Sequence, residues 1–158
     1  MDAWIGTELL RRGFLGTAAP RYADLALLLE IVMGVALIVG MFFARVGRYR
    51  LHAWCQAVVV LMNLLIIALV MMPSFRIAVA PAIPKNLDNP YYSLSTAHAV
   101  LGTLGELGGL YILIAAGTKI LPQRLRLTRY KLWMRSILIF WWIVLFLGFA
   151  TYARWYAP

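Results

Sequence analysis

The sequence contains few residues that could support chemistry of its own. A single cysteine, Cys55, excludes an intrachain disulfide, a CxxC redox pair and covalent attachment of a c-type haem. The chain has only 2 histidines, His52 and His98. No phosphate-binding loop, metal-ligand cluster or Ser–His–Asp set is visible in the sequence. We therefore expect a protein that is not an enzyme and that holds no metal.

Acidic residues are also scarce, with 6 Asp and Glu against 15 Lys and Arg, which gives a net charge of +9. Such a charge is compatible with nucleic-acid binding in a soluble protein. Here 63% of the residues are hydrophobic, and the basic residues gather in short segments between apolar runs. That arrangement is typical of membrane topology signals. The composition therefore predicts a membrane protein with no nucleic-acid partner.

Apolar runs are the main feature of the chain. Each is close to the roughly 20 residues that a helix needs to cross a bilayer. They cover about residues 25–44, 53–72, 95–116 and 136–152. Pro73 lacks an N–H group and is expected to end the second helix, as Pro122 follows the third. The sequence predicts an all-α single domain, residues 1–158, that forms an integral membrane four-helix bundle.

The basic loops predict an orientation. The loop after the first run carries Arg45, Arg48 and Arg50, and the loop before the fourth is also basic. The positive-inside rule places both loops in the cytoplasm and both chain termini on the outer side of a bacterial inner membrane. Tyr91 and Trp155 are then expected in an outer aromatic belt.

The N-terminal segment, residues 1–22, has its own pattern. We expect a short amphipathic helix at the membrane interface, with Trp4, Ile5, Leu9 and Phe14 in contact with lipid. The stretch "RRGFLG" followed by small residues is also similar to a twin-arginine export signal. A cleaved signal and a disordered tail are the alternatives.

Polar residues inside the apolar runs are costly, and their depths predict two pairs. Glu30 and His98 fall at one level in the outer half of the bilayer, and Asn63 and Glu106 fall near its midplane. Each pair could share a hydrogen bond between helices. The alternatives are a proton route, contact with a ligand, or contact with another subunit.

Glycines follow His98 on one helical face. Gly102, Gly105 and Gly109 continue that face at spacings of four, three and four residues. Such a face permits close helix packing, and it could also accept the edge of a haem, a quinone or a pigment. A haem bound by both histidines is not expected, because His52 and His98 are predicted on opposite sides of the membrane. We expect no cofactor, with haem or quinone at His98 as the alternative; Met71 or Met72 could then be a second haem ligand.

Particular stretches carry a family resemblance: "RYRLHAWCQ", "YYSLSTAHAVLGTL", "RLTRYKLWMR" and "GFATYARWY". Over about residues 45–156 the chain resembles the CtaM/YozB-like four-helix bacterial membrane family, a domain of unknown function associated with cytochrome oxidase assembly. The resemblance implies histidines in helices 2 and 3, at His52 and His98. The family's further histidines, at the outer end of helix 2 and in the basic loop before helix 4, are absent from "VMMPSF" and "TRYKLWMR". This departure favours a scaffold over a metallochaperone.

These observations lead to one preferred hypothesis and two alternatives. The preferred function is a non-catalytic accessory or assembly subunit of a bacterial electron-transfer complex, respiratory or photosynthetic, with other membrane subunits and lipids as partners. The second is a b-type haem or quinone-binding protein that uses His98. The third is a small proton-coupled transporter that uses Glu30 and Glu106.

Overall fold

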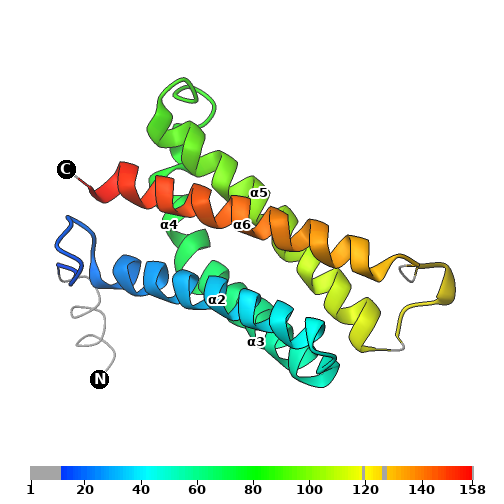
Figure 1. Cartoon of the computed structure of the whole chain (residues 1–158). Coiled ribbons are helices and arrows are strands. Elements are labelled where there is room, and N and C mark those ends of the chain that lie inside the picture. Colours follow the sequence, from blue (N-terminus) through cyan, green and yellow to red (C-terminus); the bar gives the residue numbers. More distant parts are fainter. Residues whose placement is uncertain (1–11, 119, 126–127, 158) are drawn as a thin grey trace, which may run out of the picture.

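The chain is almost entirely helical in the computed structural model, which describes residues 12–118, 120–125 and 128–157. In these residues 4 helices are long and apolar enough to cross a membrane. They are α2 (Arg21–Arg45), the continuous helix Tyr49–Ala82 that begins with α3 (Tyr49–Ile66), α5 (Pro90–Gly117) and α6 (Tyr130–Tyr156). Figure 1 shows them side by side. The predicted all-α fold and its long apolar helices are confirmed.

Every long helix extends beyond the apolar run that predicted it. The third helix, expected from about residue 95, begins at Pro90 because Asn89 caps it: the Asn89 side chain accepts the N–H of Tyr91 at 3.0 Å. Proline is well suited to the first helical position, where no N–H is needed. The apolar run thus marks the part of a helix that suits lipid, and capping and turn residues decide where the helix ends.

The turn between α2 and α3 is made by three residues, Val46 to Arg48. Gly47 has a φ of +77°, a conformation that favours glycine. Its neighbour Arg48 returns an N–H to the carbonyl of Phe43 at 2.8 Å, which satisfies a carbonyl of the last helical turn. This turn makes α2 and α3 an antiparallel hairpin.

Pro73 does not end the second long helix, so the prediction that it stops there is wrong. Pro73 is the second residue of α4 (Met72–Ala78), which follows a π-helical turn, η1 (Ile67–Met71). A 3₁₀ turn, η2 (Ala80–Ala82), continues the helix. Proline removes one helical hydrogen bond and crowds the preceding turn, and a wider turn accommodates both effects. Figure 1 shows α4 turning away from α3 towards the start of α5.

Two antiparallel hairpins, α2–α3 and α5–α6, pack against each other through contacts of α3 with α5 and of α2 with α6. The core is small: Met33 and Leu37 of α2 pack on Val59 and Ile66 of α3, with Trp141 of α6 against them. Many large apolar side chains remain exposed, for example Leu69 at 73%. Lipid is the solvent that such a surface suits. The helices indicate a multi-pass membrane protein.

Residues 12–20 form a loop, so the predicted interfacial helix does not extend over them. The two ends of this loop meet in a β-bridge between Arg12 and Pro20. The backbone N–H of Gly13 also donates to the carbonyl of Ala19 at 2.8 Å. Phe14 is exposed there. The remainder of the predicted interfacial helix, with Trp4, Ile5 and Leu9, lies outside the described residues.

Asp24 explains why this loop is not helical. Its carboxylate accepts the backbone N–H groups of Phe14 at 2.6 Å and Leu15 at 2.8 Å, and also the hydroxyl of Tyr152. These bonds replace the helical ones that residues 14 and 15 would otherwise need. Asp24 is fully buried and ties the loop, α2 and α6 together. Sequence analysis missed this role, because nothing local distinguishes Asp24 from an ordinary acidic residue in a first helical turn.

Candidate functional site

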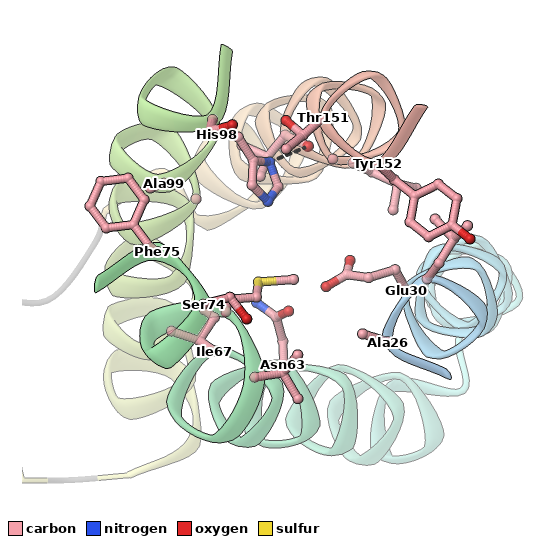
Figure 2. Close-up of a pocket in the computed structure, with 18 of the residues that line it drawn as sticks. Ala26, Glu30, Asn63, Ile67, Ser74, Phe75, His98, Ala99, Thr151 and Tyr152 are labelled. Atoms are coloured by element: carbon pink, nitrogen blue, oxygen red, sulfur yellow. Dashed lines mark hydrogen bonds between the residues drawn. The ribbon is translucent and has the colours of Figure 1, made fainter. Parts of the chain in front are cut away.

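A cavity of about 760 Å³ lies between the helices. Its lining runs from Tyr22, Arg76 and Trp155, near the end where α2 and α5 begin and α6 finishes, to Asn63 and Trp141 deeper in the bundle. Most of the lining is apolar. Figure 2 shows helices on every side of the cavity and a small set of polar side chains directed into it. Large apolar cavities with a few convergent polar groups are the usual form of a small-molecule site.

His98 of α5 presents one ring nitrogen to this cavity. Its Nδ1 lies 3.2 Å from the backbone carbonyl oxygen of Val144 on α6. A carbonyl only accepts hydrogen bonds, so Nδ1 carries the proton and Nε2 keeps its lone pair. Figure 2 shows the ring directed into the cavity. The arrangement fixes both the tautomer and the direction of a group that can accept a hydrogen bond or bind a metal.

Gly148 of α6 gives the His98 ring its space. A Cβ atom built on Gly148 would lie 3.0 Å from Cε1 of His98, closer than ordinary van der Waals contact. A side chain at this position would press on the ring, and glycine leaves the ring where it is. Sequence analysis did not identify Gly148, since "LFLGFATY" reads as an ordinary apolar helix with one small residue.

Glu30 lies on the opposite wall and does not form the predicted hydrogen bond with His98. Both residues line the cavity, and Figure 2 shows the Glu30 side chain directed into it from α2. The bond is not formed because the cavity separates the Glu30 wall from the His98 wall.

The second predicted pair is formed. Asn63 of α3 donates through Nδ2 to Oε2 of Glu106 on α5 at 2.8 Å. Asn63 also lines the cavity. Glu106 is 4% exposed, and its second oxygen, Oε1, is buried without a hydrogen-bond partner in the described part of the chain. The pair joins the two hairpins and leaves one buried polar atom unsatisfied.

The glycine face of α5 packs against α6. A Cβ atom on Gly105 would lie 3.3 Å from Cδ1 of Trp141, and one on Gly102 would lie 3.6 Å from a methyl of Val144. Gly109 contacts Trp141 and Val60 of α3 at similar distances. The Trp141 indole also donates to the carbonyl of Gly105 at 3.0 Å. Close helix packing is thus the use of this face, although Gly102 and Gly105 also line the cavity.

His52 lies away from the cavity. Its Nδ1 is 2.8 Å from the carbonyl oxygen of Gly40 at the turn end of the α2–α3 hairpin, and the residue is absent from the cavity lining. Met71 lines the cavity together with His98. Among the described residues, no group of three or more His, Cys, Asp or Glu side chains could hold a metal ion.

Aromatic residues frame the cavity at the end where α6 finishes. Trp155 stacks on Tyr91 with ring centroids 5.0 Å apart, and its indole donates to the hydroxyl of Ser95 at 2.9 Å. The rings of Tyr152 and Tyr156 also meet there, 5.2 Å apart. The residues predicted to form an outer aromatic belt, Tyr91 and Trp155, are therefore in direct contact.

The comparisons with known proteins find nothing to add: no family model, curated protein or solved structure gives a significant match to the chain. The resemblance to the CtaM/YozB-like family stays a prediction from the quoted stretches. Function has to be argued from the cavity.

Proposed function

We propose that the protein binds a lipophilic hydroxylated ring compound of the quinol class in the cavity between its helices. The observation that carries this proposal is the placement of His98 and Glu30 on opposite walls of an apolar cavity of about 760 Å³. This volume is within the range of roughly 300–1,000 Å³ that is usual for small-molecule sites.

The chemistry of the two walls favours a quinol. Nε2 of His98 accepts a hydrogen bond, and the carboxyl of Glu30 also offers acceptor oxygens. A quinol has a hydroxyl at each end of its ring, so it can donate to both walls. The apolar lining, which includes Trp142 and Phe149, suits the ring and the hydrocarbon tail.

Binding of decylubiquinol, kept reduced under anaerobic conditions, tests the proposal. Isothermal titration calorimetry in detergent should show saturable binding to the full chain. His98→Ala and Glu30→Leu should each weaken it about tenfold, since each removes a hydrogen-bond acceptor and losing a hydrogen bond in a buried site costs about 1–3 kcal/mol. His52→Ala is the matched control, because His52 lies outside the cavity. Equal affinity in all variants would contradict the proposal.

Haem is the competing ligand for His98, and a visible absorption spectrum distinguishes it. A Soret band in the purified protein that disappears in His98→Ala would assign the site to haem. If the ligand is a quinol, the spectrum has no Soret band, and the binding measured by calorimetry is assigned to the quinol. Since His52 does not line the cavity, His98 is the histidine that could bind haem there.

We propose that the chain spans a bacterial inner membrane with the Val46–Arg48 turn in the cytoplasm and the loop around Asp88 outside. The support is the clustering of basic residues beside α3 and α6. Single cysteines at Asp88 and Arg48, in a Cys55→Ala background, test this orientation. In intact spheroplasts a membrane-impermeant maleimide should label position 88 and spare position 48.

A place as an accessory or assembly subunit of an electron-transfer complex is also proposed, and a quinol site is compatible with it. Its support is the family resemblance and the extensive exposed apolar surface, for example Ile139 and Phe146 on α6. Purification in a mild detergent tests it. The hypothesis predicts fixed stoichiometry with a larger membrane complex, and a chain that purifies alone with full quinol binding would contradict it.

A further inference from the structure

We propose that Glu30 and Glu106 form a proton-binding pair, in which Glu106 holds a proton in the bundle interior and exchanges it with the cavity through Glu30. This site goes beyond ligand binding and does not depend on which ligand occupies the cavity. It rests on the burial of Glu106, on its unsatisfied oxygen and on the position of Glu30.

Glu106 lacks the hydrogen bonds that an ionised carboxylate needs. It is 4% exposed, it accepts one hydrogen bond, from Asn63, and its Oε1 has no partner in the part of the chain that the structure describes. An uncompensated charge in such surroundings costs several kcal/mol. The neutral carboxyl removes this cost and turns the orphaned oxygen into a possible O–H donor.

In the part of the chain that the structure describes, basic side chains of α2, α3 and α4 lie away from this depth. Glu106 is 16 residues after Pro90 and 11 before Gly117, so it sits about 24 Å and about 17 Å from the ends of α5 by helix rise. Arg45 and Arg48 are at the turn end of the α2–α3 hairpin, and Arg76 is on α4 at the rim of the cavity. A proton is therefore the simplest cation to neutralise Glu106.

The two carboxyls are linked through Asn63, which lines the same cavity as Glu30 and donates to Glu106. When two carboxylates repel each other, the ionised form of one disfavours that of the other, and the pair titrates as a unit. One proton shared between the two relieves the repulsion.

A short path leads from the cavity to Glu106. Glu30 lines the cavity, as does Asn63, which contacts the Glu106 carboxyl directly. Gly105, the neighbour of Glu106, also lines it and adds no side chain to block the way. The other titratable or charged residues that line the cavity come from α2, α4, α5 and α6; none comes from α3. They are Tyr22, Arg76, His98, Tyr152 and Tyr156.

Asp24 provides a comparison within the same chain, because it is a buried carboxylate that has several hydrogen-bond donors. It is fully buried too, yet its carboxylate accepts the N–H groups of Phe14 and Leu15 and the hydroxyl of Tyr152. Several donors stabilise the ionised form. One chain therefore contains a buried carboxylate with three donors and a buried carboxyl with one.

Dicyclohexylcarbodiimide, an apolar reagent for protonated carboxyls, separates the two cases. The carboxyl proton moves to a carbodiimide nitrogen while the carboxylate oxygen bonds to the central carbon, and the resulting O-acylisourea rearranges to a stable N-acylurea. Peptide mass spectrometry of the full chain in detergent should locate the adduct on Glu30 or Glu106 near neutral pH. Asp24 should stay unmodified.

The coupling between the carboxyls is tested with Glu106→Gln, which keeps the size of the side chain. Without the neighbouring charge, the midpoint pH at which Glu30 loses its labelling should fall by roughly one unit relative to the unmodified chain. Asp88→Asn, on the exposed loop, should leave that midpoint unchanged. Infrared spectra should contain a protonated-carboxyl band that disappears in Glu106→Gln.

Two results would overturn the proposal. One is a labelling midpoint of Glu30 that is identical in the unmodified chain and in Glu106→Gln. The other is an infrared spectrum without a Glu106-dependent carboxyl band, which would show that Glu106 is ionised at rest. Quinol binding is measured separately, so loss of the proton pair with intact decylubiquinol binding would leave the proposed function standing.

Discussion

The imidazole ring of His98 rests on Gly148 of the facing helix. A Cβ atom on Gly148 would lie 3.0 Å from Cε1 and 3.6 Å from Nδ1 of His98. Because Nδ1 is held by the carbonyl of Val144, the ring has no freedom to move without losing that bond. The direction of His98 Nε2 therefore depends on Gly148, which leaves room for the ring because it has no side chain.

Replacing Gly148 should disturb the ring and leave the fold intact. Gly148→Val adds a branched side chain where the ring lies, so we expect decylubiquinol affinity to fall about tenfold, the equivalent of about 1.4 kcal/mol. Calorimetry measures the change. Gly117→Ala is the control, because nothing lies within 4 Å of a Cβ at that position. Equal affinity in Gly148→Val and the unmodified chain would show that the ring position is irrelevant to binding.

The Asn63–Glu106 hydrogen bond should couple the two hairpins energetically. A double-mutant cycle with Asn63→Leu, Glu106→Leu and the double variant should give a coupling energy of about 0.6–1.7 kcal/mol, the range for hydrogen bonds between helices in membranes. Unfolding in mixed micelles with increasing dodecyl sulphate provides the free energies. Strictly additive effects would mean that the 2.8 Å contact contributes no stability of its own.

The Asp24 carboxylate should control the order of the loop before α2. Asp24→Ala removes the oxygen that accepts from both Phe14 and Leu15, so two backbone N–H groups lose their partner, at a cost of about 1–3 kcal/mol each. Hydrogen–deuterium exchange at the amides of Phe14 and Leu15 should become about tenfold faster or more. Exchange rates equal to those of Asp88→Asn would refute this role of Asp24.

Trp141 should stabilise the α5–α6 hairpin through its indole N–H. Trp141→Phe keeps an aromatic ring and removes the hydrogen bond to the carbonyl of Gly105 at 3.0 Å, so we expect a loss of about 0.5–1.5 kcal/mol. The micelle unfolding assay measures it. Trp133→Phe, at a half-exposed position on the same helix, should change stability by less.

Much of the fold and part of the site could be predicted from local pattern. The apolar runs predicted the long helices, because hydropathy and helix length depend only on neighbouring residues. Depth counting also predicted the Asn63–Glu106 bond, since helix rise fixes how deep each residue lies. The effect of Pro73 was predicted wrongly, because a π-helical turn can absorb a proline that would otherwise end the helix.

By itself, the sequence determined the long helices, their apolar character and the position of each polar side chain along its helix, all of which follow from composition and helix rise. Only the tertiary structure decided which polar groups meet. It placed a cavity between Glu30 and His98, gave His98 the Val144 carbonyl as its partner, and bound Asp24 to a loop about ten residues earlier and to Tyr152 on α6. The reason is that the position of a residue along its helix does not fix how the helix is rotated about its axis or how far it lies from its neighbours. Those are set by packing between helices, for example where Gly105 and Gly148 let α5 and α6 approach each other.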